Sequence, residues 1–308
     1  MKSLFADKSF RTAAVISFVF LSLGFILLHY GLVAYGWAFF ILLPIVTGIA
    51  IGALPNRKWA YVGLVTSLAI FFLLLLVGKL EGMICVLMAL PLVISCLFVG
   101  SVAIHLVRRR QQLLDQNSLP VIVLPFLLFL ISAPAEKALE THPATVAVRT
   151  DILLPYSAAQ VYEQIKSVDT LDAPKPFLLQ IGLPIPQKCV LEREAVGARR
   201  ICYFSGGQIV ERVTELRPGE ILRMDVVQYQ LTGRKWLGFK EAIYLFEQVD
   251  AHQTRLSRIT TYTSELKPRA YWQPLEQLGI AQEHQYVFDN LRQDLERAYG
   301  QTKPHTYY

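Results

Sequence analysis

The sequence separates sharply into an apolar half and a charged half. Residues 12–133 hold few charged side chains, whereas most of the Asp, Glu, Lys and Arg residues follow Glu136. A hydrophobic content of 53% is too high for an ordinary soluble chain. The pattern predicts a transmembrane helical region over 1–134, a polar connector over 135–144 and a soluble domain over 145–300.

Charge and cysteine content exclude several classes of function. The net charge is +6, but much of the excess lies beside apolar segments, where membrane topology explains it. The soluble half carries no basic stripe, so no nucleic-acid partner is predicted. The sequence holds no Cys-x-x-Cys motif and no His/Cys cluster, and we therefore predict no metal and no cofactor.

Four apolar segments are about the length of a bilayer span, roughly 20 residues. They cover residues 12–32, 34–54, 60–80 and 83–107. Three basic clusters fall on one face of four hairpinned spans: the N-terminus (Lys2, Lys8, Arg11), the Arg57-Lys58 loop and Arg108 to Arg110. The positive-inside rule places that face in the cytoplasm of a bacterial inner membrane. The pair Gly48-x-x-x-Gly52 predicts close helix packing.

A fifth apolar segment, 119–133, decides on which side the soluble half lies. It is short for a span and contains Pro120 and Pro125. A re-entrant or interfacial helix is the alternative, but residues 121–131 are apolar all round, which favours a span. If it crosses the membrane, everything after Glu136 is extracytoplasmic. The ionisable groups of the apolar half lie near span ends, which is typical of an anchor rather than a transporter.

In the soluble half, apolar and polar residues alternate over short runs, which predicts strands, and one long helix follows them. A capping box at Ser157 and Gln160 opens a helix that ends near Ser167. A second, short helix is expected over 177–182, and the last helix over Tyr271 to Tyr299. The strands are expected at 146–154, 187–194, 198–205, 207–216, 221–231, 239–249 and 254–264.

This order, with VGARRICYFSGGQIVERVTELRPGEILRMDV (196–226) and KPRAYWQPLEQLGIAQEHQYVFDNLRQDLE (267–296), resembles the START-like helix-grip superfamily. It is most similar to the bacterial polyketide cyclase/dehydrase-type (SRPBCC) branch. The resemblance covers about 145–299. It implies a fold class in which an α-helical transmembrane bundle precedes an α+β helix-grip domain, with a curved antiparallel sheet around a long C-terminal helix. Members bind lipids, sterols, polyketides or hormones in a cavity, and some are enzymes.

The resulting hypothesis is a membrane-tethered, non-enzymatic binding module for a hydrophobic or amphipathic, lipid-like small molecule. Its partners would be that molecule and the bilayer. One alternative is a polyketide cyclase- or lyase-like enzyme that uses Glu211 and His284 as acid and base. Another is a sensory or interaction domain.

Five residues are candidates for contact with a ligand. Glu211 shares the apolar face of a strand with Ile209 and Val213, so it is either a polar group in the cavity or the partner of Arg200 or Arg199. His284 lies on the packed face of the last helix, and a satisfied core histidine is the favoured interpretation. The other candidates are aromatic: Tyr203, Tyr244 and Tyr262.

Two further expectations concern the hairpin of residues 187–205. The Arg199-Arg200 pair is interpreted as a solvated strand edge. Cys189 lies opposite Cys202 if the turn is centred between Ala195 and Val196, which would allow a disulfide. A one-residue bulge at Gly197 would instead oppose Cys189 to Tyr203, and two free thiols are the favoured outcome.

Overall fold

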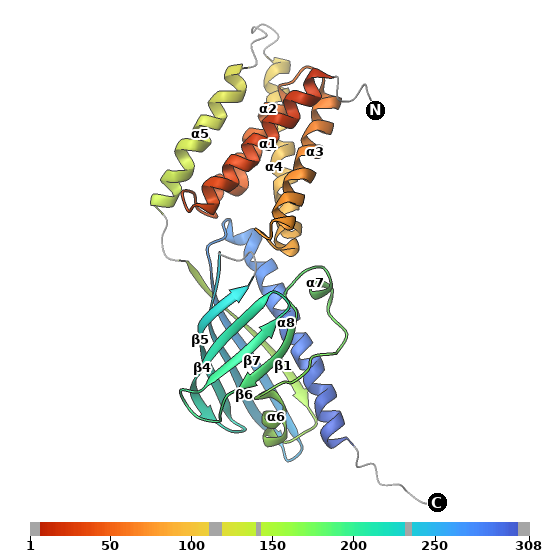
Figure 1. The fold of residues 1–308 in the computed structure, drawn as a ribbon, viewed down its shortest axis with the longest axis vertical. Coiled ribbons are helices and arrows are strands. Elements are labelled where there is room, and N and C mark those ends of the chain that lie inside the picture. The colour runs from red at the N-terminus through yellow and green to blue at the C-terminus, as the bar shows by residue number, and fades with distance from the viewer. Residues whose placement is uncertain (1–6, 111–118, 140–142, 232–235, 301–308) are drawn as a thin grey trace, which may run out of the picture. The chain divides into compact units, whose positions relative to one another are not determined.

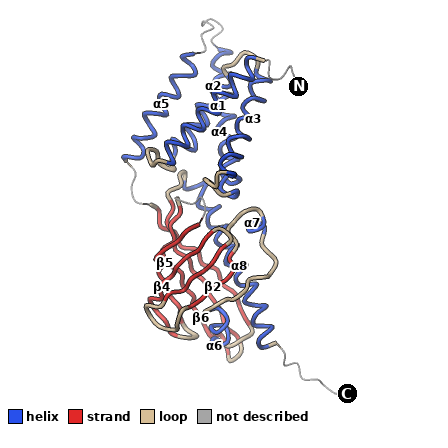
Figure 2. The backbone as a smooth tube through the Cα atoms, in the orientation of Figure 1, coloured by secondary structure: helices blue, strands red, loops and turns tan. Residues whose placement is uncertain are grey.

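The computed structural model describes residues 7–110, 119–139, 143–231 and 236–300. The chain divides into two compact units, Met1–His142 with Glu265–Trp272, and Pro143–Ser264 with Gln273–Tyr308. Within the described ranges, the first unit holds the apolar helices α1 to α5 and the second holds the strands (Figures 1 and 2). Lys2, used above to predict orientation, lies outside the described residues.

Three helices of the described chain are long and apolar enough to cross a membrane, and the prediction of a membrane region is confirmed to that extent. They are α1 (Lys8–His29), α3 (Arg57–Val77) and α4 (Met83–Arg110). α1 begins at Lys8 because the Asp7 carboxylate accepts hydrogen bonds from the backbone N–H groups of Ser9 and Phe10.

The second expected span is shorter than the sequence indicates. A π-helical turn, η1 (Ala38–Leu42), leads into α2 (Leu43–Gly52). Pro44 has no N–H to donate, which disturbs the regular α-helical bonding at this point. The start is fixed by Glu136, whose two carboxylate oxygens accept from the N–H groups of Trp37 and Ala38 at 2.9 and 2.8 Å. These bonds supply acceptors for N–H groups that a helix start leaves unpaired.

Glycine allows α2 and α4 to approach at backbone contact distance. A Cβ atom built on Gly48 would lie 2.1 Å from the carbonyl oxygen of Leu97, and one on Gly100 would lie 2.1 Å from that of Ile45. Both distances are far below van der Waals contact, so larger residues are excluded at both positions. The close helix packing expected from the Gly48-x-x-x-Gly52 pair is confirmed.

The fifth apolar segment forms α5 (Leu119–Ala138), a helix of 20 residues that includes Pro125 and Pro134. The ring of Phe126 stacks on that of Phe20 in α1, with centroids 3.8 Å apart. Phe129 and Ala133 are fully buried against α1 and α2 in one apolar cluster. The length matches a span, and the crossing itself stays a prediction.

The second unit is a seven-stranded antiparallel sheet with the order β1-β7-β6-β5-β4-β3-β2. The strands are β1 (Ala144–Leu154), β2 (Pro186–Leu191), β3 (Arg199–Phe204), β4 (Gly207–Arg217), β5 (Ile221–Leu231), β6 (Leu237–Asp250) and β7 (Gln253–Ser264). Two short helices, α6 (Ala158–Ile165) and α7 (Phe177–Gln180), precede β2. The capping box of Ser157 and Gln160 opens α6 as predicted.

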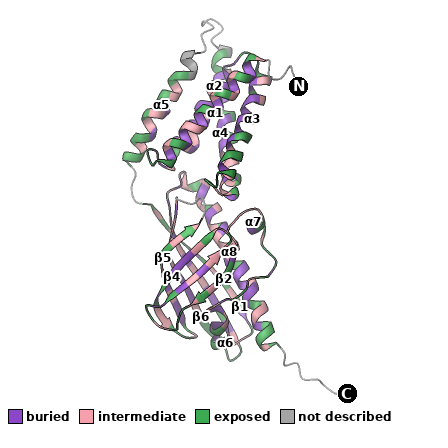
Figure 3. Ribbon diagram, viewed as in Figure 1, coloured by how far each residue is buried: buried purple, intermediate pink, exposed green. Residues whose placement is uncertain are grey.

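The last helix, α8 (Arg269–Tyr299), lies along the sheet, and the predicted helix-grip fold is confirmed (Figure 1). Buried and exposed residues alternate along α8 (Figure 3). Its buried side chains Phe288, Leu291 and Leu295 pack with Leu222 and Leu256 of the sheet in the main core. We call the face of the sheet that packs on α8 the inner face.

Candidate functional site

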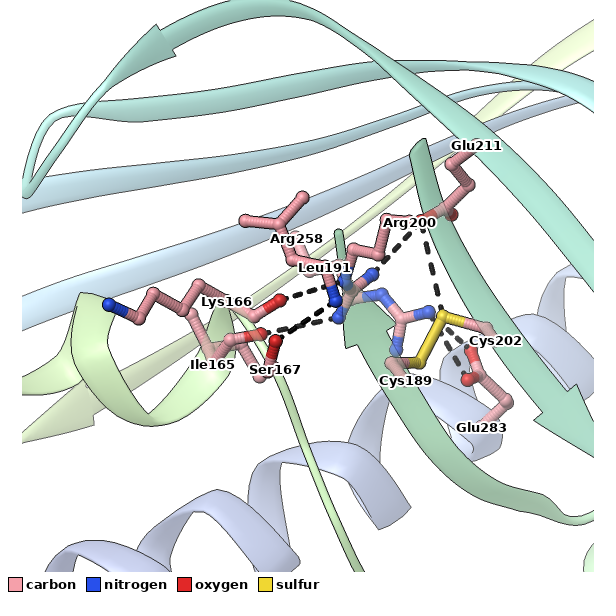
Figure 4. Close-up of a disulfide and its surroundings, with 10 residues drawn as sticks. All are labelled: Ile165, Lys166, Ser167, Cys189, Leu191, Arg200, Cys202, Glu211, Arg258 and Glu283. Carbon is pink, nitrogen blue, oxygen red and sulfur yellow. Dashed lines mark hydrogen bonds and ion pairs between the residues drawn. A yellow bond between two sulfur atoms is a disulfide. The ribbon is translucent and has the colours of Figure 1, made fainter. Parts of the chain in front are cut away.

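Several charged side chains lie on the inner face, at one level along the strands, where apolar residues would be expected. In the sheet register Arg200 of β3 is opposite Glu211 of β4, and Tyr244 of β6 is opposite Arg258 of β7. α8 contributes Glu283 and His284 to the same level. We call these six residues the polar cluster, and Figure 4 shows both arginines with their carboxylate partners.

Glu211 lies on the inner face, and its partner is Arg200, as one of the two interpretations expected. The Arg200 Nη1 atom is 3.0 Å from Glu211 Oε2, and the two residues are only 2% and 6% exposed. The interpretation of Arg199-Arg200 as a solvated edge is wrong for Arg200. Neighbours in a strand point to opposite faces, so Arg199 is exposed while Arg200 points inward.

Tyr244 lies close to both arginines. Its ring centroid lies 5.7 Å from the Cζ atom of Arg200 and 5.5 Å from that of Arg258, within the range of cation–π attraction. Arg258 Nη2 is 3.0 Å from the carboxylate of Glu283. Among the described residues, Arg258 Nε and Nη1 are buried without a hydrogen-bond acceptor. Burial raises the pKa of Glu283, and the Arg258 guanidinium opposes that shift.

His284 is fully buried and both ring nitrogens have a hydroxyl partner. Nδ1 is 2.7 Å from Thr150 Oγ1, and Nε2 is 2.7 Å from Thr260 Oγ1. Burial first, and then the charge of Arg258, lower the pKa of His284 well below its usual range. These contacts match the expected core histidine. No hydrogen bond joins His284 to Glu211 in the described part of the chain, so the structure does not bring the two together as an acid–base pair.

The three tyrosine candidates lie in different surroundings. Tyr262 is fully buried, and its hydroxyl donates to the Glu276 carboxylate at 3.0 Å. Tyr244 belongs to the polar cluster described above. Tyr203 follows Cys202 in β3 and therefore points to the opposite face, where Lys188 Nζ lies 4.9 Å from its ring centroid. The structure does not bring Tyr203 to the other candidates.

The expectation of free thiols at Cys189 and Cys202 is wrong. The two residues are paired in the register and joined by a disulfide, with Cα atoms 4.1 Å apart. The irregularity in this pairing lies between Pro186 and Lys188, not at Gly197, so the register of the hairpin is kept at the cysteines. Cys202 Sγ is 4.0 Å from Glu211 Oε2, which places the bridge beside the polar cluster (Figure 4).

Sequence reasoning missed Arg258 and Glu283. The alternation in β7 could have revealed Arg258. Every second residue of this strand faces inward, and Arg258 falls in that set with Thr254, Leu256 and Thr260. An arginine in such a series must find an anionic partner. Glu283 precedes His284 in the helix that supplies that partner.

No family model and no curated protein matches the chain. Solved structures match its second half. They include a protein of Thermus thermophilus, with 18% identity and a TM-score of 0.36, over 50% of this chain and 99% of that one. The Zhui aromatase/cyclase of a Streptomyces species matches at 14% identity and a TM-score of 0.37, over 50% and 95%. A START superfamily protein from Mycobacterium smegmatis matches at 9% and 0.38, over 49% and 98%. These are likenesses of fold.

Proposed function

We propose that this chain is a membrane-tethered module that binds a hydrophobic or amphipathic small molecule, without catalysis, between the inner face of the sheet and α8. One observation carries the proposal: a second apolar cluster, separate from the main core, joins the sheet to α8, and several of its side chains are only partly buried. On the α6 side of the polar cluster, side chains such as Leu154, Leu256 and Leu295 are completely buried. On the other side, Val148, Leu237 and Tyr262 are buried, and the apolar side chains of the sheet unit and of α8 that pack against them are only partly buried: Val146, Trp236, Phe239, Ile280 and Ala281.

Partly exposed apolar side chains between a sheet and a helix are what a binding site for an apolar molecule requires. Covering each of them would stabilise a complex by about 25 cal/mol per Å² of apolar surface removed from water. Tyr262 belongs to this cluster, and Glu211, His284 and Tyr244 lie at the adjoining level. In the proposal these four line the binding site or support its polar end. The separate partners of Glu211 and His284 favour binding over acid–base catalysis.

Mass spectrometry of the purified full chain tests the binding. The wild type, released from a non-ionic detergent, should carry co-purified or added apolar molecules. Ala281→Phe should lose them, because the larger ring fills the space beside Ile280. The matched control is Ala298→Phe, an exposed position on the same helix. Equal retention by wild type and Ala281→Phe, or none by wild type, contradicts the proposal.

The second unit is proposed to be extracytoplasmic. The disulfide between Cys189 and Cys202 supports this, because structural disulfides persist in oxidising compartments such as the bacterial periplasm. The basic residues beside α1, α3 and α4 favour a cytoplasmic N-terminus, and α5 is long enough for the additional crossing. A reporter enzyme that works only outside the cytoplasm should be active when fused after Tyr308. An inactive fusion, beside an active control fused at Lys79, refutes the crossing.

A further inference from the structure

Within the polar cluster, the ion pair of Arg258 and Glu283 is more exposed than the rest. Arg200, Glu211 and Tyr244 are at most 6% exposed, and His284 is completely buried. By side chain alone, Arg200 and Glu211 are 3% and 9% exposed, whereas Arg258 and Glu283 are 12% and 18% exposed. A molecule that enters between the sheet and α8 can therefore reach this pair before any other charged group of the cluster.

The position of the pair along α8 gives it a defined place in the site. Ile280 lies about one turn before Glu283 and Ala281 two residues before it, and both are partly buried. One turn after it lie Val287 and Phe288, which are buried in the main core at 7% and 1% exposure. Glu283 and Arg258 thus lie between the partly buried apolar cluster and the main core. The polar end of an amphipathic ligand would meet the pair there.

The charges at this boundary are already balanced. Arg258 has Glu283, and Arg200 has Glu211, each at 3.0 Å. His284 has a hydroxyl on each ring nitrogen, at 2.7 Å in both cases, and burial favours its neutral form. A carboxylate or ammonium brought by a ligand would have no counter-ion of its own, and burying an unpaired charge is unfavourable. A neutral oxygen, by contrast, brings no charge that needs a counter-ion at this boundary.

We infer that the ligand carries an uncharged polar group, such as a hydroxyl, carbonyl or amide, on an otherwise apolar body, and that this group contacts the Arg258–Glu283 pair. The inference rests on the proposed binding function and adds the chemical class of the ligand. It excludes free fatty acids and other amphiphiles with a charged head group as preferred ligands.

Three probes of equal chain length separate the possibilities: hexadecanol, hexadecanoic acid and hexadecylamine. The full chain in a non-ionic detergent is mixed with equal amounts of the three at about pH 8, above the ordinary range of carboxyl groups. Bound probes are counted by native mass spectrometry. The wild type should retain the alcohol at least about tenfold over either charged probe, as expected when binding would bury an unpaired charge.

Two substitutions should change the preference in opposite directions. Glu283→Gln removes the negative charge, so hexadecanoate should gain about tenfold or more relative to wild type. Arg258→Met removes the positive charge, and hexadecylamine should gain instead. The control is Glu247→Gln, which breaks the exposed pair that Glu247 forms with Arg255 and should leave the order of the probes unchanged.

The outcomes distinguish a failure of this inference from a failure of the proposed binding function. Retention of hexadecanoate by wild type at the level of the alcohol overturns the inference but keeps the binding function. The same holds if Glu283→Gln leaves the ratio of acid to alcohol unchanged. A gain of one particular charged probe in each variant cannot be produced by misfolding alone, because misfolding does not select the sign of the probe's charge. If wild type retains none of the three, the proposed function fails and this inference fails with it.

Discussion

Arg200→Met should strongly destabilise the second unit because Arg200 joins three elements. Its guanidinium donates to Glu211 at 3.0 Å and to the backbone oxygens of Lys166 and Ile165 at 3.1 and 3.2 Å. The substitution leaves a buried carboxylate on β4 without its cation, and two carbonyls at the end of α6 without a donor. Breaking one side of a buried ion pair costs about 3–5 kcal/mol.

The expected shift is large enough for a melting experiment. At about 2–4 °C per kcal/mol for a domain of this size, Arg200→Met should lower the midpoint by about 6–20 °C. The full chain in detergent can be followed by far-ultraviolet circular dichroism. The double variant Arg200→Met with Glu211→Leu removes both charges and should recover most of that loss, because a buried pair is often replaced by apolar residues at little cost.

An exposed ion pair provides the matched control. Arg255 and Glu247 are in contact at 2.9 Å, but their side chains are 46% and 62% exposed. Arg255→Met should therefore change the free energy of unfolding by less than about 1 kcal/mol. The reasoning is refuted if Arg200→Met melts like wild type, or if the double variant is less stable than Arg200→Met alone.

Three further predictions concern other parts of the chain. Gly48→Leu should destabilise the first unit by about 1–3 kcal/mol through overpacking of α2 on α4, whereas Gly82→Ala should not; thermal aggregation in detergent compares them. His284 has a lowered pKa in the folded state, so its contribution to stability is present above about pH 6.5 and declines as the pH falls below that value, because the unfolded chain binds the proton first. Melting at a series of pH values should show a weaker acid dependence for His284→Gln. Thiol titration of the unfolded, unreduced chain should detect only the two cysteines outside the Cys189–Cys202 bridge, and reduction should lower stability by about 3 kcal/mol; four reactive thiols before reduction contradict the bridge.

Much of the fold follows from local patterns that the sequence displays directly. Strand β5 occupies the predicted range, Ile221–Leu231, because alternation and the flanking turn residues define it without reference to any other segment. The capping box at Ser157 is equally local. The bounds of the second apolar helix could not be predicted in this way. This helix begins where Glu136, distant in sequence, accepts two backbone N–H groups, and no local pattern contains that contact.

The candidate site shows the same division between local and long-range information. The alternation in β4 correctly turned Glu211 inward, but its choice between Arg199 and Arg200 depended on the register of β3. The pairing of Cys189 with Cys202 depended on the neighbouring hairpin of β2 and β3, where the position of a bulge decides which residues are opposed. A one-residue shift of β3 that set Ile201 opposite Glu211 would have turned Arg200 outward and left the Glu211 carboxylate buried without a cation. The energetic cost of that unpaired charge, several kcal/mol, is therefore a physical reason against that shift. The same inward side of β3 that carries Arg200 also carries Cys202, so the ion pair to β4 and the disulfide to β2 both require this orientation of the strand.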